Sequence, residues 1–324
     1  MASSPDEIRY DVPLTNLGQP LFDGADATKR DLVDYLDAVA ERILPELRDR
    51  PLSVIRVRPG QEPFMQKNLP KYTPDWVRRT TLWADASKRE VAYALCDDRR
   101  TLIWFANQRA VEYHPTLMRA EDWKHVTHLV LDLDPPSEVA PAEGFKAAVR
   151  AAHLVRRALD DCGLAGAVKT SGAKGVHVVV PVGDQHSIED VAAATRAVAA
   201  RAERLDPDLA TTAFLKEDRG GKVFLDSTRA GGATVVAAYS PRVRPGAPVS
   251  FPVGWEDLDR VEPRDFTIRN AAALAADRDP WAEQLPQPQR LPDVLVAEGH
   301  TIPVARVQAM HEGKRRARAR RTAE

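Results

Sequence analysis

The sequence has few cysteines, no long apolar run and almost no net charge. Its two cysteines, Cys96 and Cys162, give neither a disulfide framework nor the spacing of a zinc site, which favours a reducing compartment. No stretch resembles a signal peptide or approaches the roughly 20 apolar residues of a membrane span. A net charge of -1 over 324 residues, 44% of them hydrophobic, is ordinary for a globular chain. We therefore expect a soluble cytoplasmic protein with no membrane partner.

The near-neutral balance hides a basic C-terminus. Six of the eight residues from 314 to 321 are Lys or Arg, and the run lacks apolar periodicity. Such a tail suits contact with phosphate backbones of any sequence, so Lys314, Arg315 and Arg316 are candidate DNA-binding residues. The alternative is a solubilising end without a fixed partner. Because prolines recur from about residue 284, we expect a catalytic domain over 1–285, then a linker and basic tail over 286–324.

Helical and strand patterns alternate along the chain, which predicts an α+β fold with mixed sheets flanked by helices. Apolar residues at three-to-four spacing indicate a helix over 28–48, with Thr28 as its N-terminal cap. Two further helices are expected over 143–162 and 188–204. The expected strands are 51–57, 90–95, 101–105, 126–133, 166–180, 222–226 and 233–239, with a hairpin turn at 97–100.

The segment from His128 to Pro136 ends an apolar strand on two acidic residues. Residues two apart in a strand share a face, so Asp132 and Asp134 should point into one site. Two adjacent carboxylates repel one another unless a cation joins them, and Mg²⁺ or Mn²⁺ suits oxygen ligands. The same pattern also occurs in sugar-nucleotide transferases and in plain strand-to-turn junctions. Alone, it makes this strand only a candidate metal site.

The segment from Ser171 to Pro181 offers groups that a phosphate needs. It combines a hydroxyl, glycines, Lys174 and His177, but it lacks the Walker spacing G-x-x-x-x-G-K-[ST]. Asp226 ends another short apolar run and is a third acidic candidate. Taken alone, the glycine turn could be an ordinary hairpin and His177 a core residue. Together the motifs favour two-metal phosphoryl transfer.

A proline-rich loop follows residue 239. Proline fixes φ and removes backbone donors, so residues 240–250 should form a stiff extended loop. This loop carries Arg242 and Arg244, either of which could face an anion.

These motifs, in this order, resemble the polymerase domain of bacterial end-joining DNA ligases, within the archaeo-eukaryotic primase superfamily. The similarity covers roughly residues 11 to 285. The matching segments are Leu14 to Asn16, Thr28-Lys29, Arg50 to Ser53, Phe64 to Asn68, Glu112 to Pro115, Asp132 to Asp134, Ser171 to His177, Asp226, Tyr239 to Arg242 and Ala247 to Ser250. The resemblance implies a primase-like fold with the active site in a cleft between two lobes.

The resemblance also implies roles for individual residues. Asp132, Asp134 and Asp226 would bind two divalent ions, Mn²⁺ or Mg²⁺, for in-line attack of a primer 3′-hydroxyl on the α-phosphate. The implied nucleotide-binding residues are Ser171, Lys174, His177, Arg242, Arg244, Arg56 and His114. Members of the family often favour ribonucleotides.

The family further recognises a 5′-phosphate across a gap and stacks an aromatic pair on the template. Asn16 and Lys29 match the phosphate-binding positions, whereas Gln19 stands where the family has a lysine. Phe64 matches the first aromatic position and Met65 follows it; Lys67, in the same segment, is a further candidate for DNA binding. Loss of the lysine favours general gap filling over strong 5′-phosphate anchoring.

The resemblance therefore predicts a polymerase that transfers NTP or dNTP units to a DNA primer on gapped duplexes or broken ends. Its partners would be a separate DNA ligase and Ku, and the protein would be associated with the nucleoid. The alternatives are a primase, a catalytically silent module that binds DNA ends, and a nucleotide-sugar transferase.

Overall fold

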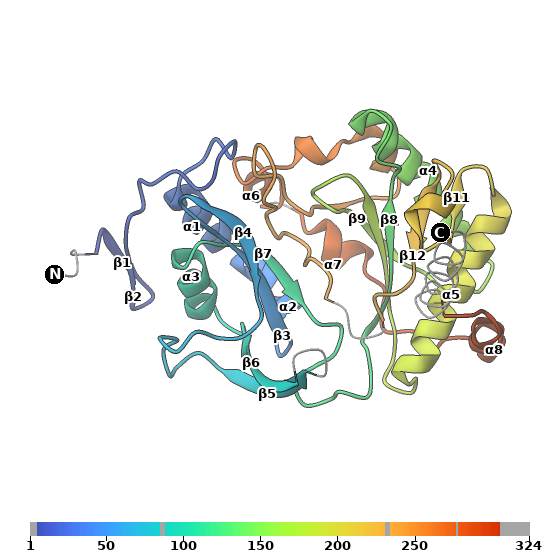
Figure 1. Cartoon of the computed structure of the whole chain (residues 1–324), viewed down its shortest axis with the longest axis horizontal. Coiled ribbons are helices and arrows are strands. Elements are labelled where there is room, and N and C mark those ends of the chain that lie inside the picture. Colours follow the sequence, from blue (N-terminus) through green and yellow to red (C-terminus); the bar gives the residue numbers. More distant parts are fainter. Residues whose placement is uncertain (1–4, 85–87, 231–233, 277, 305–324) are drawn as a thin grey trace, which may run out of the picture. The chain divides into compact units, whose positions relative to one another are not determined.

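The computed structural model describes residues 5–84, 88–230, 234–276 and 278–304. The chain forms two compact units (Figure 1). Unit 1 combines 1–125, 167–173 and 232–284, and unit 2 combines 126–166, 174–231 and 285–324. Among the described helices, none has both the length and the apolar character needed to cross a bilayer.

Unit 1 is built around an antiparallel sheet of order β4-β3-β6-β5, with β7 pairing β3 on a separate branch. A second pairing joins β9 to β13. The strands of this unit are β1 (Glu7–Arg9), β2 (Val12–Leu14), β3 (Pro51–Arg58), β4 (Gln61–Gln66), β5 (Arg79–Ala84), β6 (Arg89–Leu95), β7 (Ala110–Pro115), β9 (Ala167–Thr170) and β13 (Pro252–Val253).

Two helices of unit 1 begin at side-chain caps that the sequence encodes. The expected helix over 28–48 is present as two helices, α1 (Lys29–Ala38) and α2 (Ala40–Leu47), and Thr28 forms a capping box with Asp31. The expected strand over 101–105 is wrong. Its residues lie in α3 (Arg99–Asn107), because Asp98 accepts a hydrogen bond from the Thr101 backbone amide at 2.7 Å and starts a helix.

Short helical segments complete this unit near its C-terminal end. They are η2 (Leu258–Arg260), η3 (Pro263–Asp265), α6 (Ala271–Leu274) and α7 (Pro280–Gln284).

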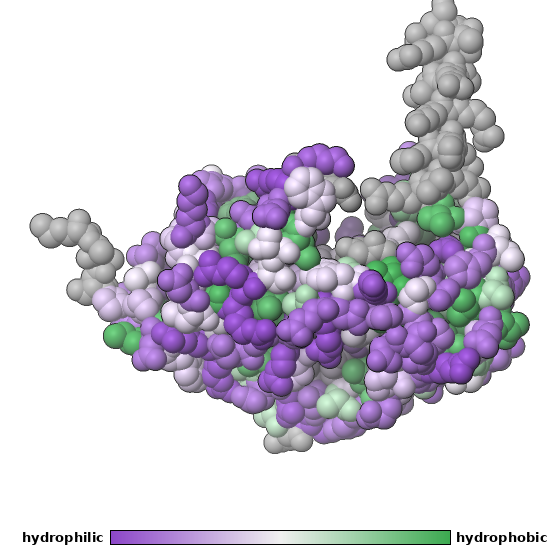
Figure 2. Space-filling view, turned by 90° about the horizontal axis from the view of Figure 1, so that it is seen from below, coloured by the Kyte–Doolittle hydropathy of each residue, from purple (hydrophilic) through white to green (hydrophobic). Residues whose placement is uncertain are grey.

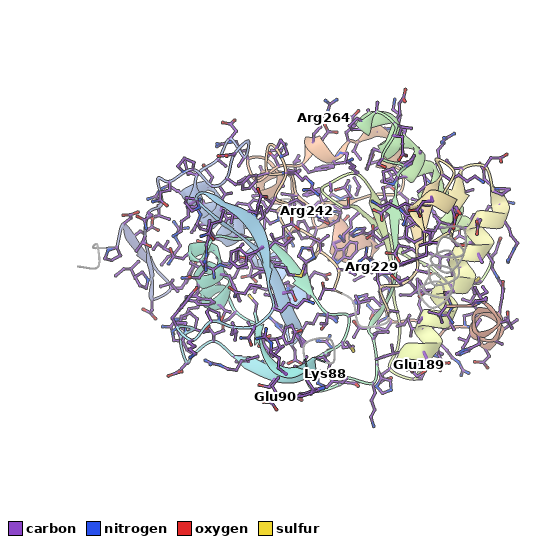
Figure 3. The ribbon with its side chains drawn as sticks, viewed as in Figure 1. Lys88, Glu90, Glu189, Arg229, Arg242 and Arg264 are labelled. Carbon is purple, nitrogen blue, oxygen red and sulfur yellow. The ribbon has the colours of Figure 1, made fainter. Side chains whose placement is uncertain are left out.

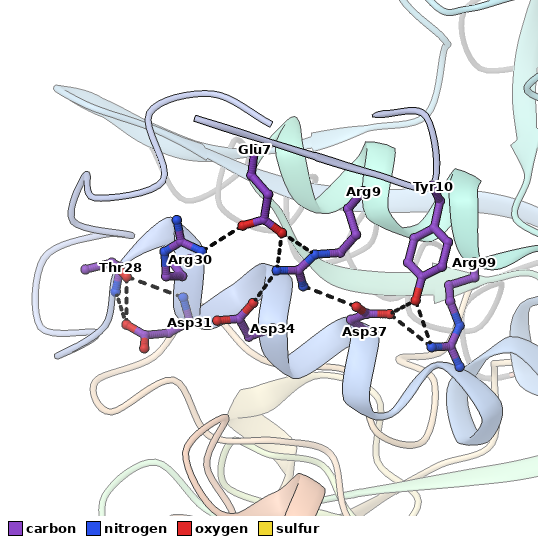
Figure 4. Close-up of polar contacts among 9 residues, drawn as sticks. All are labelled: Glu7, Arg9, Tyr10, Thr28, Arg30, Asp31, Asp34, Asp37 and Arg99. Carbon is purple, nitrogen blue, oxygen red and sulfur yellow. Dashed lines mark hydrogen bonds and ion pairs between the residues drawn. The ribbon is translucent and has the colours of Figure 1, made fainter. Parts of the chain in front are cut away.

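An ionic network fixes the N-terminal β1–β2 hairpin to α1 (Figure 4). Arg9 lies 2.9 Å from Asp34 and 3.2 Å from Asp37, and Glu7 pairs with Arg30 at 2.9 Å. Exposed ion pairs contribute little individually, but several in one network hold a short hairpin more firmly. The hairpin leads directly into the segment that carries Asn16.

Unit 2 contains a sheet of order β11-β12-β8-β10. Its strands are β8 (His128–Asp134), β10 (Val176–Pro181), β11 (Ala210–Thr211) and β12 (Val223–Asp226). Helices α4 (Pro141–Asp160) and α5 (Ile188–Leu205) pack on this sheet and on each other, and η1 (Lys216–Asp218) precedes β12. The leucines of β8, Leu129, Leu131 and Leu133, have no exposed surface. The strand therefore buries one face, and Asp132 and Asp134 on the other face are partly exposed.

The expected linker is partly structured. Val182 forms a β-bridge with Gln289, and α8 (Asp293–Thr301) packs on α5 in unit 2. A Cβ on Gly299 would lie 1.8 Å from the Ala193 carbonyl oxygen, so the two helix backbones approach too closely for any other residue. The boundary at residue 285 stays a prediction, but residues 289 and 293–301 belong to a folded unit.

The combination of mixed sheets and packed helices confirms the predicted α+β class. Placement of the active site between two lobes stays a prediction. Hydrophilic residues cover most of the face shown in Figure 2, and hydrophobic residues reach it in separate small groups. Larger apolar side chains such as Phe105, Tyr113 and Tyr239 are fully buried.

Candidate active site

Three aspartates come together on adjacent strands of unit 2. Asp132 and Asp134 lie two residues apart on β8, and β12 pairs antiparallel with β8 so that Asp226 stands opposite Asp132. We call these three residues the carboxylate cluster. Burial raises the pKa of Asp134 to about 6, and the charges of Asp132 and Asp226 add to the shift. Like charges are thus held close in a site with little access to water.

Two cationic or titratable side chains contact the carboxylate cluster. The Arg229 guanidinium lies 2.6 Å from Asp132 and 3.1 Å from Asp226. Burial alone would lower the pKa of Arg229, but the surrounding carboxylates outweigh it and raise the pKa. His177 on β10 stands opposite Asp132 across the sheet, with Nε2 3.2 Å from an Asp132 carboxylate oxygen. Arg229, which is labelled in Figure 3, therefore supplies the positive charge that this cluster requires.

The donor set of the cluster suits a hard divalent ion, because it consists of carboxylate oxygens. Within the described ranges, however, no three His, Cys, Asp or Glu side chains are already grouped as a ligand set for a metal. The geometry explains this, since one Asp132 oxygen faces Arg229 and the other faces His177, while Asp226 accepts hydrogen bonds from Thr228. Arg229 would therefore compete with a metal ion for Asp132 and Asp226.

The loop before β10 approaches β8 closely. A Cβ on Gly175 would lie 2.2 Å from the Leu133 carbonyl oxygen, so only glycine fits between the loop and the strand. Lys174, the preceding residue, is exposed in unit 2. The glycine thus brings the loop against the strand that carries Asp132 and Asp134.

Unit 1 contains a second polar cluster, centred on Glu112 of β7. One Glu112 carboxylate oxygen lies 2.9 Å from Nε2 of His114 and 3.0 Å from Nε of Arg242. The other oxygen accepts a hydrogen bond from the Val243 backbone amide at 2.8 Å. Only 3% of Glu112 is exposed. The Glu112 cluster, formed by Glu112, His114 and Arg242, therefore joins two of the predicted nucleotide-binding residues.

The pKa shifts in this cluster define its protonation. Burial by itself would raise the pKa of Glu112, but the hydrogen bond with His114 and the charge of Arg242 outweigh it and lower the pKa to about 2. Burial lowers the pKa of His114, although Glu112 opposes this shift. At neutral pH Glu112 is ionised and His114 is neutral. The imidazole proton consequently resides on Nε2, where it is donated to Glu112.

Ser171 and Gly172, which directly follow β9, support Arg242. The Arg242 guanidinium donates to the Ser171 carbonyl oxygen, and Ser171 is 6% exposed. Gly172 has a φ of +67°, and a Cβ there would lie 2.7 Å from Cγ of Arg242. The structure therefore brings Ser171, His114 and Arg242 together through Glu112 and β9.

The two remaining arginines of the predicted nucleotide site have other partners. Arg56 is 5% exposed and donates to Gln66 at 2.7 Å and to the Tyr72 hydroxyl at 3.0 Å. Arg244 is exposed and borders a cavity of about 790 Å³ in unit 1, which Gln19, Arg58 and Arg109 also line. Arg56 and Arg244 thus lie outside the contacts that define the Glu112 cluster.

The residues predicted to bind DNA differ in their exposure. Asn16 and Lys67 are exposed, and Phe64 is half-buried with the Arg58 guanidinium 4.9 Å from its ring centre. Lys29 is only 3% exposed and donates to the Thr15 carbonyl oxygen at 2.5 Å. Burial, followed by the charge of Arg109, lowers the pKa of Lys29 to about 8. The predicted tail residues Lys314, Arg315 and Arg316 lie outside the described residues.

Two central residues, Arg229 and Glu112, were assigned no role from the sequence, although Glu112 begins one of the matching segments. Arg229 follows Asp226 by three positions and could have been suspected as a counter-ion of that carboxylate. Glu112 shares a strand face with His114, because the two residues lie two positions apart. No local pattern, however, indicates that Glu112 meets Arg242, which lies far away in sequence.

Comparisons with known proteins agree with this arrangement. The family model for the LigD primase-polymerase domain matches residues 28–281. The chain is 33% identical over 272 residues to a bifunctional non-homologous end joining protein LigD of Bacillus subtilis, covering 81% of this chain and 43% of that protein. It is 32% identical over 262 residues to a multifunctional LigD of Mycolicibacterium smegmatis, covering 79% and 34% respectively. The chain thus spans less than half the length of these relatives.

A solved structure is similar over nearly its whole length. The polymerase domain of Mycobacterium tuberculosis ligase D, in complex with DNA, matches with a TM-score of 0.76 and 32% identity, covering 86% of this chain and 98% of that one. Polymerase domains of this kind are DNA-directed nucleotidyltransferases that generally use divalent metal ions. The predicted resemblance, fold class and enzyme class are confirmed. The chain therefore belongs to the LigD primase-polymerase domain family.

Proposed function

We propose that this chain transfers nucleotides from NTP or dNTP to a DNA primer 3′-hydroxyl under the direction of a template, for gap filling or end processing in DNA repair. The observation that carries the proposal is the register of β8 and β12, which sets Asp226 opposite Asp132 beside Asp134. A nucleotide-sugar transferase with a D-x-D pair does not require the third carboxylate.

Asp132, Asp134 and Asp226 would hold two divalent ions, Mn²⁺ or Mg²⁺. Bound there, such ions lower the pKa of a hydroxyl and neutralise charge on a phosphate. Arg229 pairs with the same carboxylates and offsets their repulsion before an ion binds. His177 lies against Asp132 and restricts how that carboxylate can turn.

The triphosphate requires cationic and N–H donors, because negative charge grows on the departing pyrophosphate. In unit 2 we assign Lys174, which is exposed, and His177 to this task. In unit 1 we assign Ser171, Arg242 and His114, which the Glu112 cluster and β9 hold together. Arg56 and Arg244 complete the proposed nucleotide-binding residues.

DNA contact is assigned to Asn16, Lys29, Phe64 and Lys67, with Lys314, Arg315 and Arg316 of the tail. Phe64 offers a stacking face that tolerates any base. Lys29 is buried in this structure and must leave the Thr15 carbonyl oxygen before it can reach a phosphate. The proposed setting is the nucleoid in the cytoplasm, with Ku at broken ends and a DNA ligase activity to seal the filled strand.

The test is extension of a labelled primer across a short gap with Mn²⁺ or Mg²⁺, comparing ribonucleotides with deoxynucleotides. Wild type should incorporate nucleotides, whereas Asp132→Ala combined with Asp134→Ala should not. Asp184→Ala, at an exposed position of unit 2, is the matched control and should behave as wild type. Asp226→Ala should also abolish incorporation, whereas a sugar transferase would retain most of its activity.

Other outcomes distinguish the remaining alternatives. Synthesis from nucleotides and template without a primer would assign primase activity. Binding of DNA ends by the folded wild type, without incorporation under any metal or primer condition, would refute polymerisation and favour the silent end-binding module. Retention of broken duplexes only when Ku is present would support the Ku partnership.

A further inference from the structure

Glu112 is a buried carboxylate that is surrounded by donors. Its two oxygens contact His114, Arg242 and the Val243 backbone amide, at distances of 2.9, 3.0 and 2.8 Å. The side chains of Glu112, His114 and Arg242 are 4%, 11% and 15% exposed. Such a carboxylate has little room to act on a substrate itself, but it controls the two residues that it contacts.

The backbone around Glu112 explains how a residue of β7 reaches the loop that carries Arg242. The chain that leads into that loop lies alongside β7. The Ala237 amide donates to the Tyr113 carbonyl oxygen at 2.9 Å, and the Tyr113 amide donates to the Ser240 hydroxyl at 2.9 Å. The Val243 amide then donates to Glu112. Glu112 therefore fixes both the loop backbone and the side chain of Arg242.

The guanidinium of Arg242 is held from two sides. Glu112 contacts its Nε, and the Ser171 carbonyl oxygen accepts from Nη1. An arginine that is fixed in this way loses less rotational freedom when it binds a phosphate than a free side chain would. The ionised Glu112 can only accept hydrogen bonds, so it also fixes the proton of neutral His114 on Nε2 and leaves Nδ1 as an acceptor.

We infer that Glu112 is a positioning residue for nucleotide binding, which orients Arg242 and sets the tautomer of His114. The inference rests on the proposed function, because it assumes that Arg242 and His114 serve the incoming nucleotide. Glu112 itself would not touch the nucleotide. Its loss should therefore affect nucleotide affinity through its partners.

The decisive variant is Glu112→Gln, which preserves size but removes the charge and places an amide donor among the donors of His114 and Arg242. We expect KM for the incoming nucleotide to rise about 10- to 100-fold, as for loss of a charge-assisted contact, with a smaller change in kcat. Glu90→Gln, the same change at an exposed position of β6, should leave KM unchanged. A wild-type KM in folded Glu112→Gln would overturn the inference.

A double-mutant cycle separates positioning from a general structural role. If Glu112 acts mainly through Arg242, Glu112→Gln combined with Arg242→Gln should raise KM little more than Arg242→Gln alone. Multiplication of the two single effects would instead show that Glu112 acts independently of Arg242, which contradicts the inference. If Glu112→Gln fails to fold, Glu112→Asp is the second variant, because it retains the charge on a shorter side chain. Its KM should lie between the wild-type value and the increase of about 10- to 100-fold expected for Glu112→Gln. A wild-type KM in Glu112→Asp would likewise contradict the inference.

Two readouts do not depend on turnover. Binding of Mn²⁺–ATP, measured by calorimetry on the full chain, should weaken in Glu112→Gln by the same factor as KM rises. Long-range ¹H–¹⁵N spectra at pH 7, assigned with His114→Asn, should show the Nε2–H tautomer of His114 in wild type and a mixture in the variant. Failure of wild type to extend primers would refute the proposed function, whereas unchanged binding and an unchanged tautomer would refute the Glu112 inference alone.

Discussion

The substitution Gly172→Ala tests how tightly the chain is packed beneath Arg242. Gly172 has a φ of +67°, a conformation that costs an alanine about 1 kcal/mol. The added Cβ would also lie 2.7 Å from Cγ of Arg242, 2.7 Å from the Ser250 nitrogen and 2.8 Å from the Val249 carbonyl carbon. Two of these atoms belong to the backbone and cannot move cheaply. Overpacking of this kind costs about 1–3 kcal/mol, so the total is about 2–4 kcal/mol.

Gly60→Ala provides the matched control, because the two glycines share nearly the same backbone conformation in unit 1. Gly60 has a φ of +70°, but no heavy atom lies within 4 Å of its added Cβ. Only the conformational cost of about 1 kcal/mol should remain. The difference between the two variants therefore measures the contact with Arg242 and the backbone of 249–250.

Urea denaturation followed by circular dichroism gives both unfolding free energies under the same conditions. Gly172→Ala should lose at least about 1 kcal/mol more than Gly60→Ala. It should also raise KM for the nucleotide, since the Arg242 stem must move away from the new methyl group. Equal losses of unfolding free energy in the two variants would refute the packing argument.

Three further predictions follow from the described contacts. Arg229→Gln should lower the melting temperature of the metal-free protein, because Asp132 and Asp226 lose their counter-ion. It should also increase the rise in melting temperature that Mn²⁺ produces. An unchanged rise would show that Arg229 does not compete with the metal. Lys29 has a pKa of about 8 in the fold against an ordinary 10.5, so its contribution to stability is present above pH 10.5 and lost as pH falls through 8. Lys29→Met should therefore raise the unfolding free energy at pH 7 by about 1–2 kcal/mol, and urea titrations should show this gain shrinking towards pH 10. A gain that is constant with pH would contradict the lowered pKa of Lys29. Asp98→Ala should lower the unfolding free energy by about 1 kcal/mol, because it removes the N-cap of α3, and thermal unfolding would detect this loss. An unchanged unfolding free energy would show that α3 does not depend on the cap.

The carboxylate cluster could be predicted from sequence to a large extent. The two-residue period of a strand places Asp132 and Asp134 on one face whatever the rest of the fold does. Asp226 could be proposed as a partner only because it ends a strand-like run. That it stands opposite Asp132 is a property of strand register, which hydrogen bonding between distant segments decides.

Local sequence was less informative where apolar residues are continuous. Residues 101–105 read as a strand because a short apolar run does not distinguish a strand from a buried helix by period alone. The cap at Asp98 and the packing of α3 on α1 stabilise a helix there instead. The expected strand over 166–180 is likewise divided into β9 and β10, since the loop at 171–175 contains glycines in close backbone contact.

The kinds of chemical group available follow from local sequence: a carboxylate pair on a strand, a glycine-rich loop with a lysine, and arginines on a proline-rich loop. They can be read locally because periodicity and backbone restrictions act within a few residues. Which of these groups meet depends on the three-dimensional fold. The pairing of Arg229 with the carboxylate cluster, the contact of Glu112 with Arg242 and the burial of Lys29 all depend on segments far apart in sequence, whose approach is set by core packing and strand register.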